Sequence, residues 1–403
     1  MNDAKVVIVG AGQAGLALSH ELTQAGVEHL VLEKGRVGET WRGRWDSFCL
    51  VTPNWSVLLP GGHYDGDDPD GFMPRDEFVR YLERYGAGFK APVREGVVVT
   101  SIGPGPDGGF LLKTSAGALA PETVVLATGA FQRPHRVAAA ASLPSDLLQI
   151  DVEDYRNPGE LPAGPVLVVG SGQSGCQISE ELHEAGRDVF LACGRTSWLP
   201  RIIDERDFVW WYQETGFLDD PVGGLPSPEA RLFGNVQATG HGGGRDLHYR
   251  TLQSRGVTLL GRLVGAEARK AHFAPDLAAS VAWGDERYSE LADRIRKVVV
   301  ERGLPAFDMP EPEPFDAAAP EELDLGGFGA VVFAGGFRPD YSSWVHIPGA
   351  FDELGFPVHE NGESTVAPGL HFVGVHWLRK RKSSALIGVG EDAAIVASRI
   401  SSR

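Results

Sequence analysis

Residues 6–15 read V-V-I-V-G-A-G-Q-A-G, and residues 166–175 repeat the pattern as V-L-V-V-G-S-G-Q-S-G. Both are short apolar runs followed by G-x-G-x-x-G. The agreement extends past the glycines, because Glu21-Leu22 answers Glu181-Leu182 at the same spacing of 160 residues. A strand, a glycine-rich turn and a helix in this order bind dinucleotides. Glycine-rich turns also occur in α/β proteins that bind no nucleotide, but two full copies in register predict an α/β fold with two Rossmann-like dinucleotide-binding domains.

Each glycine of the motif has its own task. The first turns the chain off the strand, the second lets the backbone approach a pyrophosphate, and the third lets helix and strand pack closely. The pyrophosphate then lies against free N–H groups at a positive helix end. The predicted phosphate-binding residues are Gly10, Gly12, Gln13, Ala14 and Gly15 in the first copy and Gly170, Gly172, Gln173, Ser174 and Gly175 in the second.

The two copies differ where the nucleotide is discriminated. Glu33 lies about 20 residues past the first glycines, where an acid accepts hydrogen bonds from ribose hydroxyls; Lys34 follows it. The second copy has no acid there, and Arg195 follows its strand. A guanidinium favours a 2′-phosphate. The first site therefore suits FAD or NAD, and the second suits NADPH, unless Arg195 is simply a solvated loop charge.

Composition narrows the function classes. The chain has 403 residues, which is enough for two or three domains, and a net charge of −17, which disfavours nucleic acid as a partner. No apolar run reaches the ~20 residues of a membrane span, and no secretory leader is recognisable, so we expect a cytoplasmic protein with no membrane contact. The three cysteines form no C-x-x-C, so neither a redox disulfide nor a metal site is predicted. The basic run 378–382 is either an isolated surface run or a phosphate contact.

The order of the segments predicts an inserted domain. Residues 124–129 are typical of a buried strand that ends in small residues, and residues 329–339 repeat this pattern. Small residues there permit close approach of a ligand, so the cofactor-binding candidates include Ala127, Thr128, Gly129, Gly335 and Gly336. A last strand and helix after residue 370 are typical of a domain that is interrupted and finished later. We therefore predict an FAD-binding domain of residues 1–145 and 325–403 and an inserted NADPH-binding domain of residues 146–324, with a substrate-facing segment around 200–320. Within it the aromatic run 208–212 is either core packing or a substrate wall.

Together these motifs resemble the class B flavin monooxygenases, which include the flavin-containing, N-hydroxylating and Baeyer–Villiger enzymes. The resemblance covers nearly the whole chain and rests on both fingerprints, the Glu33 acid and four shorter stretches: residues 38–42, 126–129, 154–156 and 333–336. The family often carries F-x-G-x-x-x-H-x-x-x-Y/F before the second fingerprint. Aligned on Tyr155, this chain has Ser145, Leu147 and Asp151 in place of Phe, Gly and His, which weakens assignment to a named subgroup.

The resemblance implies an NADPH- and FAD-dependent monooxygenase. NADPH would reduce FAD, and reduced flavin with O2 would give a C4a-(hydro)peroxide that oxygenates a small nitrogen or sulfur nucleophile or a carbonyl compound. Family members often use an asparagine near the flavin, so Asn54 is the catalytic candidate, with a turn residue beside Pro53 as the alternative. The loop 35–45 would lie along the cofactor through Thr40, Trp41, Arg42 and Trp45, where the two tryptophans either flank the flavin or simply pack. A homodimer is a further expectation from the family.

Two other functions remain open at this point. The first is an FAD-dependent NADPH oxidase or reductase that inserts no oxygen, and the departure at Asp151 keeps it in play. The second is a nucleotide-binding redox sensor without turnover. Oxygenated product separates the monooxygenase from the oxidase, and reduction of flavin by NADPH separates both enzymes from the sensor.

Overall fold

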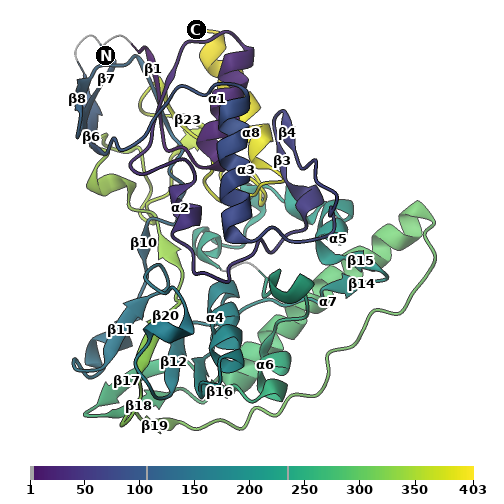
Figure 1. The fold of residues 1–403 in the computed structure, drawn as a ribbon. Helices are drawn as coiled ribbons and strands as arrows, with labels where there is room; N and C mark the ends of the chain where they lie inside the picture. Colours follow the sequence, from purple (N-terminus) through teal and green to yellow (C-terminus); the bar gives the residue numbers. More distant parts are fainter. Residues whose placement is uncertain (1–3, 106–107, 234–235) are drawn as a thin grey trace.

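The computed structural model describes residues 4–105, 108–233 and 236–403. Two α/β units, each built on its own parallel sheet, lie one above the other in Figure 1. None of the helices in the described ranges is long and apolar enough to cross a membrane.

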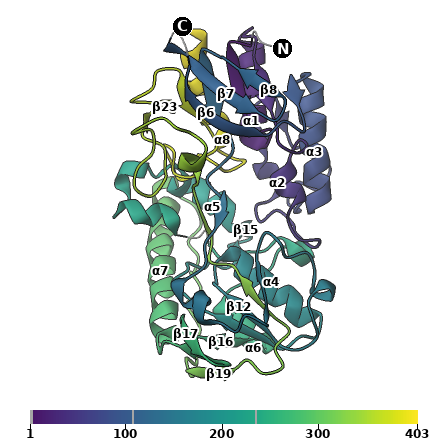
Figure 2. The same ribbon diagram turned by 90° about the vertical axis from the view of Figure 1, so that its left-hand side faces the viewer.

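The first sheet has the strand order β22-β23-β24-β9-β1-β2-β5. Its parallel centre comprises β1 (Val6–Val9), β2 (Leu30–Leu32), β5 (Val93–Arg94), β9 (Thr123–Leu126) and β24 (Leu370–Phe372), and β22 (His359–Glu360) and β23 (Glu363–Ser364) extend it antiparallel. Successive strand side chains point to opposite faces. Val6 and Ile8 therefore pack with α1 (Gln13–Gln24), α3 (Arg75–Gly88) and α8 (Val389–Ser401), while Val7 and Val9 pack toward the meander β6 (Val99–Pro104), β7 (Phe110–Thr114) and β8 (Gly117–Leu119) (Figure 2).

The second sheet is entirely parallel, in the order β11-β20-β12-β13-β16. Its strands are β11 (Leu148–Asp151), β12 (Val166–Val169), β13 (Val189–Ala192), β16 (Thr258–Leu260) and β20 (Ala330–Phe333). On one face Val166 and Val168 pack with α4 (Gln173–Glu184) and α6 (Tyr249–Arg255). On the other face Leu167 and Val169 pack toward the sheet of β17 (Leu263–Glu267), β18 (Lys270–Phe273) and β19 (Glu322–Asp324).

The remaining elements surround the space between the two sheets or fill the edges. Helix α2 (Glu39–Arg42) follows β2, and α5 (Phe208–Glu214) packs with α7 (Leu277–Arg302) in a separate aromatic cluster. Short hairpins are β3 (Leu58–Leu59) with β4 (Gly62–His63) and β14 (Ile202–Ile203) with β15 (Arg206–Asp207). The 3₁₀ helices are η1 (Asn54–Ser56), η3 (Ala138–Ser142), η4 (Pro158–Glu160), η5 (Phe217–Asp219), η6 (Val222–Gly224), η7 (Pro228–Leu232), η8 (His241–Gly243) and η9 (Tyr341–Ser343).

The two chain crossings between the sheets run side by side. Outgoing β10 (Arg133–Pro134) pairs antiparallel with returning β21 (Phe337–Arg338). Strand β20 lies between β11 and β12 in the second sheet, whereas the prediction placed residues 325–403 in the first unit. The chain therefore returns to the first sheet after Phe333, and the "strand ending in small residues" at 330–336 belongs to the second unit rather than the first.

Candidate functional site

The third glycine of each fingerprint lets a helix pack directly on a strand turn. A Cβ built on Gly15 would lie more than 1 Å closer to the Gly10 carbonyl oxygen than the 3.0 Å that real Cβ atoms keep, and a Cβ on Gly175 would meet the Gly170 carbonyl in the same way. Both glycines are thus required for packing, as the motif predicts.

The first glycine of each motif turns the chain, and the second leaves room for a ligand. Gly10 and Gly170 have φ of 106° and 107°, a left-handed conformation that favours glycine. A Cβ on Gly12 or Gly172 would meet nothing within 4 Å. Helices α1 and α4 start there without a side-chain cap, so the N–H groups of their first turns are available to an anion. Each turn therefore fits a pyrophosphate.

The ends of the second strands differ as predicted. Glu33 is buried, and its carboxylate accepts the N–H of Ala11 at 2.8 Å and that of Gly35 at 2.9 Å. At the corresponding place in the second unit stands Cys193, a buried thiol whose pKa burial raises.

Neutral groups close the turn in the second unit. Gly194 donates its N–H to Ser171 Oγ (2.8 Å), and the Tyr249 hydroxyl donates to the Gly194 carbonyl (2.6 Å). The first turn thus carries a fixed negative charge beside the ribose position, and the second does not. That difference favours a free ribose in the first site and tolerates a 2′-phosphate in the second.

Both glycine turns open into one cavity of about 2050 Å³. Pockets for a single small ligand are roughly 300–1,000 Å³, so this volume suits more than one bound molecule. The predicted cofactor residues that line it are Gly10, Gly12, Gln13, Ala14, Glu33, Lys34, Thr40, Trp41, Ala127, Thr128, Gly129, Gly170, Gly172, Gln173, Ser174, Arg195, Gly335 and Gly336.

Asn54 does not line this cavity, contrary to its predicted catalytic place. Its amide is buried, donates to the Asp68 carbonyl (2.9 Å) and accepts the N–H of Met73 (2.8 Å). Both ends of the amide thus hold the loop that leads into α3, which is the role of a structural turn residue.

Four other predicted contacts also lie outside the cavity lining, namely Gly15, Gly175, Arg42 and Trp45, and the two glycines instead pack against the turns. Trp45 is buried against Phe48, with ring centroids 5.1 Å apart. Arg42 donates to Glu83 Oε1 (2.5 Å) and to the Val37 carbonyl (3.2 Å). Trp41 does line the cavity, and its indole N–H donates to Gln13 Oε1 (2.9 Å), which ties α2 to the first glycine turn. The packing alternative therefore describes Trp45, and the cofactor prediction for Arg42 does not fit its position.

The cavity has nine cationic side chains, and six of them pair with carboxylates. Within the described ranges Lys34, Arg44 and Arg195 have no such partner. Arg44, which sequence reasoning missed, has a buried Nε without a hydrogen-bond partner, and burial lowers its pKa while nearby Glu153 acts in the opposite direction. Unpaired cations facing a cavity are the groups expected to meet phosphates.

The basic run 378–382 is paired with carboxylates. Lys380 and Lys382 pair with Asp219 and Glu391, and Arg381 pairs with Asp220 at 3.2 Å. The bonds to Asp219 and Asp220 join the C-terminal segment to η5 and the residue after it, so the run is not an isolated surface run.

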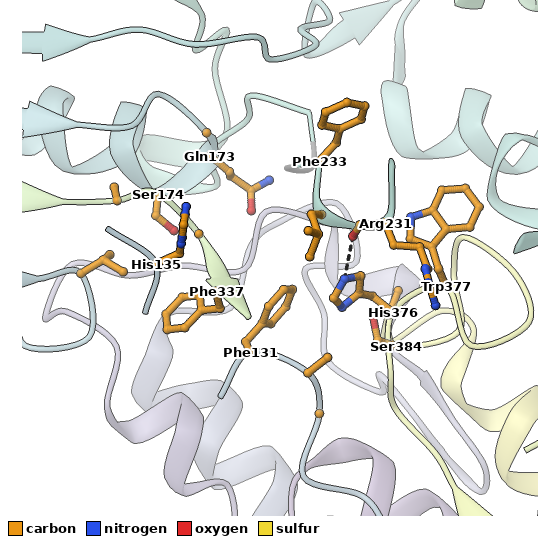
Figure 3. Close-up of a pocket in the computed structure, with 18 of the residues that line it drawn as sticks. Phe131, His135, Gln173, Ser174, Arg231, Phe233, Phe337, His376, Trp377 and Ser384 are labelled. Atoms are coloured by element: carbon orange, nitrogen blue, oxygen red, sulfur yellow. Dashed lines mark hydrogen bonds between the residues drawn. The ribbon is translucent and has the colours of Figure 1, made fainter. Parts of the chain in front are cut away.

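Side chains from both units face each other across the cavity in Figure 3. Gln173 and Ser174 lie on one side, His376 and Trp377 lie on the other, and Phe131 lies between. The His376 ring stacks on Phe131 (centroids 5.0 Å apart) and donates Nε2–H to the Arg231 carbonyl (2.8 Å). Burial lowers the pKa of His376 to about 4, so the imidazole is neutral at neutral pH. No local pattern marks this residue, because the fold alone brings it to the cavity.

Comparison with known proteins agrees with this geometry. Residues 7–207 match a family described as pyridine nucleotide-disulphide oxidoreductase. An oxidoreductase of Geobacillus kaustophilus described as CzcO-like is 31% identical over 96% of this chain and 95% of its own length. The chain belongs to this CzcO-like family of oxidoreductases.

Solved structures share the fold. A flavin-containing monooxygenase from Stenotrophomonas maltophilia superposes with a TM-score of 0.69 at 18% identity, covering 100% of this chain and 99% of that one. A bacillithiol disulfide reductase from Staphylococcus aureus superposes with a TM-score of 0.65 at 12% identity, covering 99% and 98%. These likenesses confirm the predicted α/β fold with two Rossmann-like domains and agree with the resemblance to class B flavin monooxygenases. The predicted cofactors, FAD and NADPH, agree with a pyridine nucleotide family and with the shared fold of a flavin-containing monooxygenase.

Proposed function

We propose that this oxidoreductase is an NADPH- and FAD-dependent monooxygenase that oxygenates a small nitrogen or sulfur nucleophile or a carbonyl compound. One observation carries the proposal. The two glycine turns, residues 10–15 and 170–175, are called cradles below; one has an acid at the ribose position, the other has none, and both open into a single cavity. FAD in the first and NADPH in the second would share that cavity, as hydride transfer requires.

The cysteines argue against electron transfer to a disulfide substrate through a protein dithiol. Cys193 lines the cavity but is buried, and Cys176 is buried as well. Burial raises the pKa of both thiols, which suppresses the reactive thiolate. Since the described part of the chain has no other cysteine at the cavity, the site offers no protein dithiol to carry electrons to a disulfide.

The chain's own residues have three tasks in this proposal. The backbone of the glycine turns, with Lys34, Arg44 and Arg195, binds phosphates. Glu33 orients the first ribose. The apolar walls exclude water, which protects a reactive oxygen species from side reactions. Bound FAD supplies the redox chemistry by accepting a hydride from NADPH and passing electrons to O2.

The test uses the FAD-loaded protein, NADPH and ¹⁸O2 with a panel of amines, sulfides and ketones. Mass spectrometry would detect one labelled oxygen atom in an oxygenated product, with NADPH consumed in proportion. If, with every panel member, the H2O2 formed accounts for all of the NADPH consumed, the alternative applies. The protein is then an FAD-dependent NADPH oxidase or reductase without oxygen insertion. The shared fold with a disulfide reductase favours keeping that second candidate. Cytoplasmic location and a homodimeric assembly remain expectations.

A further inference from the structure

Part of the cavity lining, called the lobe below, comes from elements other than the two cradles. Its wall comes from α5, η5, α7 and the segment before α8, and includes Phe208, Tyr212, Phe217, Leu291, Trp377 and Ile387. Most of these side chains belong to one apolar and aromatic cluster. The aromatic run 208–212 therefore serves both predicted purposes. Trp211 lies in the core, while Phe208, Val209 and Tyr212 form part of the cavity wall.

Tyr212 is held rigidly in this wall. Its ring stacks on Phe217 with centroids 4.4 Å apart and meets the Phe208 ring edge-on at 5.2 Å. The Arg381 guanidinium covers Phe217 at 3.8 Å. The ring is therefore fixed from several sides, so the hydroxyl has a defined direction.

The Tyr212 hydroxyl has no hydrogen-bond partner among the residues that the structure describes, although the side chain lines the cavity. Burial raises its pKa, so the group stays protonated and is an O–H donor. A polar group with an unused donor in an apolar wall is the usual way in which a pocket orients a ligand.

Three arginines and three carboxylates pair with one another in the lobe. Arg381 and Arg294 share Asp220, at 3.2 and 3.0 Å. Arg287 pairs with both Glu286 at 2.9 Å and Glu290 at 2.7 Å. The lobe thus lacks the unpaired cations that mark the nucleotide cradles and suits a neutral ligand rather than a phosphate.

We propose that this lobe is the substrate subsite and binds a neutral, ring-bearing apolar molecule whose oxygen accepts a hydrogen bond from the Tyr212 hydroxyl. That the ligand is the substrate rests on the proposed monooxygenase function. The predicted binding of the ligand by the lobe does not depend on that function. Apolar contact with Leu291, Ile387 and Trp377 would supply affinity, and the hydroxyl would select the acceptor.

Two probes of equal shape test the hydrogen bond. Acetophenone carries a carbonyl oxygen, and α-methylstyrene carries a methylene group in its place. Equilibrium dialysis against the FAD- and NADP⁺-loaded protein gives both dissociation constants without turnover. A neutral hydrogen bond corresponds to a preference of roughly 2- to 12-fold for acetophenone. We expect Tyr212→Phe to abolish that preference and leave the affinity for α-methylstyrene unchanged.

Matched variants separate this result from general damage. Tyr85→Phe removes a hydroxyl that donates to the Pro60 carbonyl (2.8 Å) away from the cavity, and should keep the preference. Ile387→Ala should weaken both probes equally, because it removes apolar contact and leaves Tyr212 with its Phe208 and Phe217 neighbours in place. A preference that survives Tyr212→Phe overturns the proposal, as does a variant whose only change is a higher KM for NADPH, which would assign the lobe to the nucleotide.

The two proposals fail in different ways. If the Tyr212-dependent preference is measured but no labelled oxygen enters any product, the subsite stands and the monooxygenase function is wrong. If oxygenation is observed but the preference is absent, the subsite is wrong and the function stands.

Discussion

Replacing the third glycine of either fingerprint should remove one cofactor and spare the other. In Gly15→Ala the new methyl group would overlap the Gly10 carbonyl oxygen, and in Gly175→Ala it would overlap that of Gly170. The overlaps are nearly the same, so the two variants form a matched pair. To relieve the overlap, α1 or α4 must move away from its strand and carry with it the N–H groups that face the pyrophosphate.

Overpacking of this kind costs about 1–3 kcal/mol. If this free-energy cost reduces cofactor binding, the affinity for the cofactor drops roughly 5- to 150-fold, since about 1.4 kcal/mol is a factor of ten. We expect purified Gly15→Ala to lose FAD on dialysis, and Gly175→Ala to stay loaded with FAD while its KM for NADPH rises by that factor. Flavin absorbance and initial rates measure the two effects.

A control variant guards against a general loss of stability. Gly88→Ala near the end of α3 places its methyl group in open space, so neither cofactor should be affected. Thermal unfolding should show similar losses for the two fingerprint variants. If Gly15→Ala binds FAD within twofold of the natural protein, or if both variants lose both cofactors equally, the assignment of one nucleotide to each turn is refuted.

Four further results are expected. Arg195→Gln should raise the KM for NADPH roughly tenfold while leaving that for NADH unchanged, because a phosphate contact is worth about 1.5 kcal/mol or more; equal changes for both nucleotides would show that Arg195 is only a loop charge. Arg44→Gln should weaken retention of FAD on dialysis without altering the KM for NADPH, and the opposite pattern would place Arg44 at the second nucleotide. Asn54→Ala should lower the free energy of unfolding by about 1–3 kcal/mol, since Met73 N–H and the Asp68 carbonyl lose their partner, with kcat per bound FAD unchanged; a large fall in kcat at full FAD loading would restore its catalytic role. The pKa of His376 is lowered to about 4 from 6.5, so the unfolded chain binds a proton on this ring more tightly than the folded protein does. The stability of the folded protein that depends on the neutral ring, about 3 kcal/mol, is complete above pH 6.5 and is lost as the pH falls toward 4. In urea unfolding, His376→Phe should lose less stability than the natural protein over that pH range, and an equal loss would contradict the buried neutral ring.

The local chemistry of the cradles could be predicted because it depends on residues that are close together in the sequence. The glycines, the Glu33 acid and its replacement by Cys193 all lie within short spans whose geometry the turn imposes. Asn54 shows the opposite case. An amide beside a proline is compatible with either a cofactor contact or a loop bond, and only the position of residues 68–73, which the sequence does not specify, determines which one forms.

The misplaced strand β20 has a similar cause. Both β9 and β20 are apolar runs that end in small residues, and each packs beside a fingerprint: a Cβ on Gly10 would meet the Ala127 carbonyl at 2.8 Å, and one on Gly170 would meet the Ala334 carbonyl at 2.5 Å. The pattern therefore states that a strand neighbours a glycine turn, but not which turn. Which distant strands pair depends on how the whole faces of the sheets and helices pack, and no short stretch of sequence contains that information.

This repeated relation also explains how the two sites come to share one cavity. Each companion strand leads, within a few residues, into one of the two paired crossings: β9 into β10, and β20 into β21. The chain thus leaves each cradle directly through the connection between the units, and Phe131, His135 and Phe337 from these crossings line the cavity (Figure 3). Because β10 and β21 pair with each other, the two small-residue turns are joined through one short antiparallel ladder. Lengthening one crossing alone would break that pairing, and we expect hydride transfer from NADPH to slow while the affinity for each cofactor stays the same.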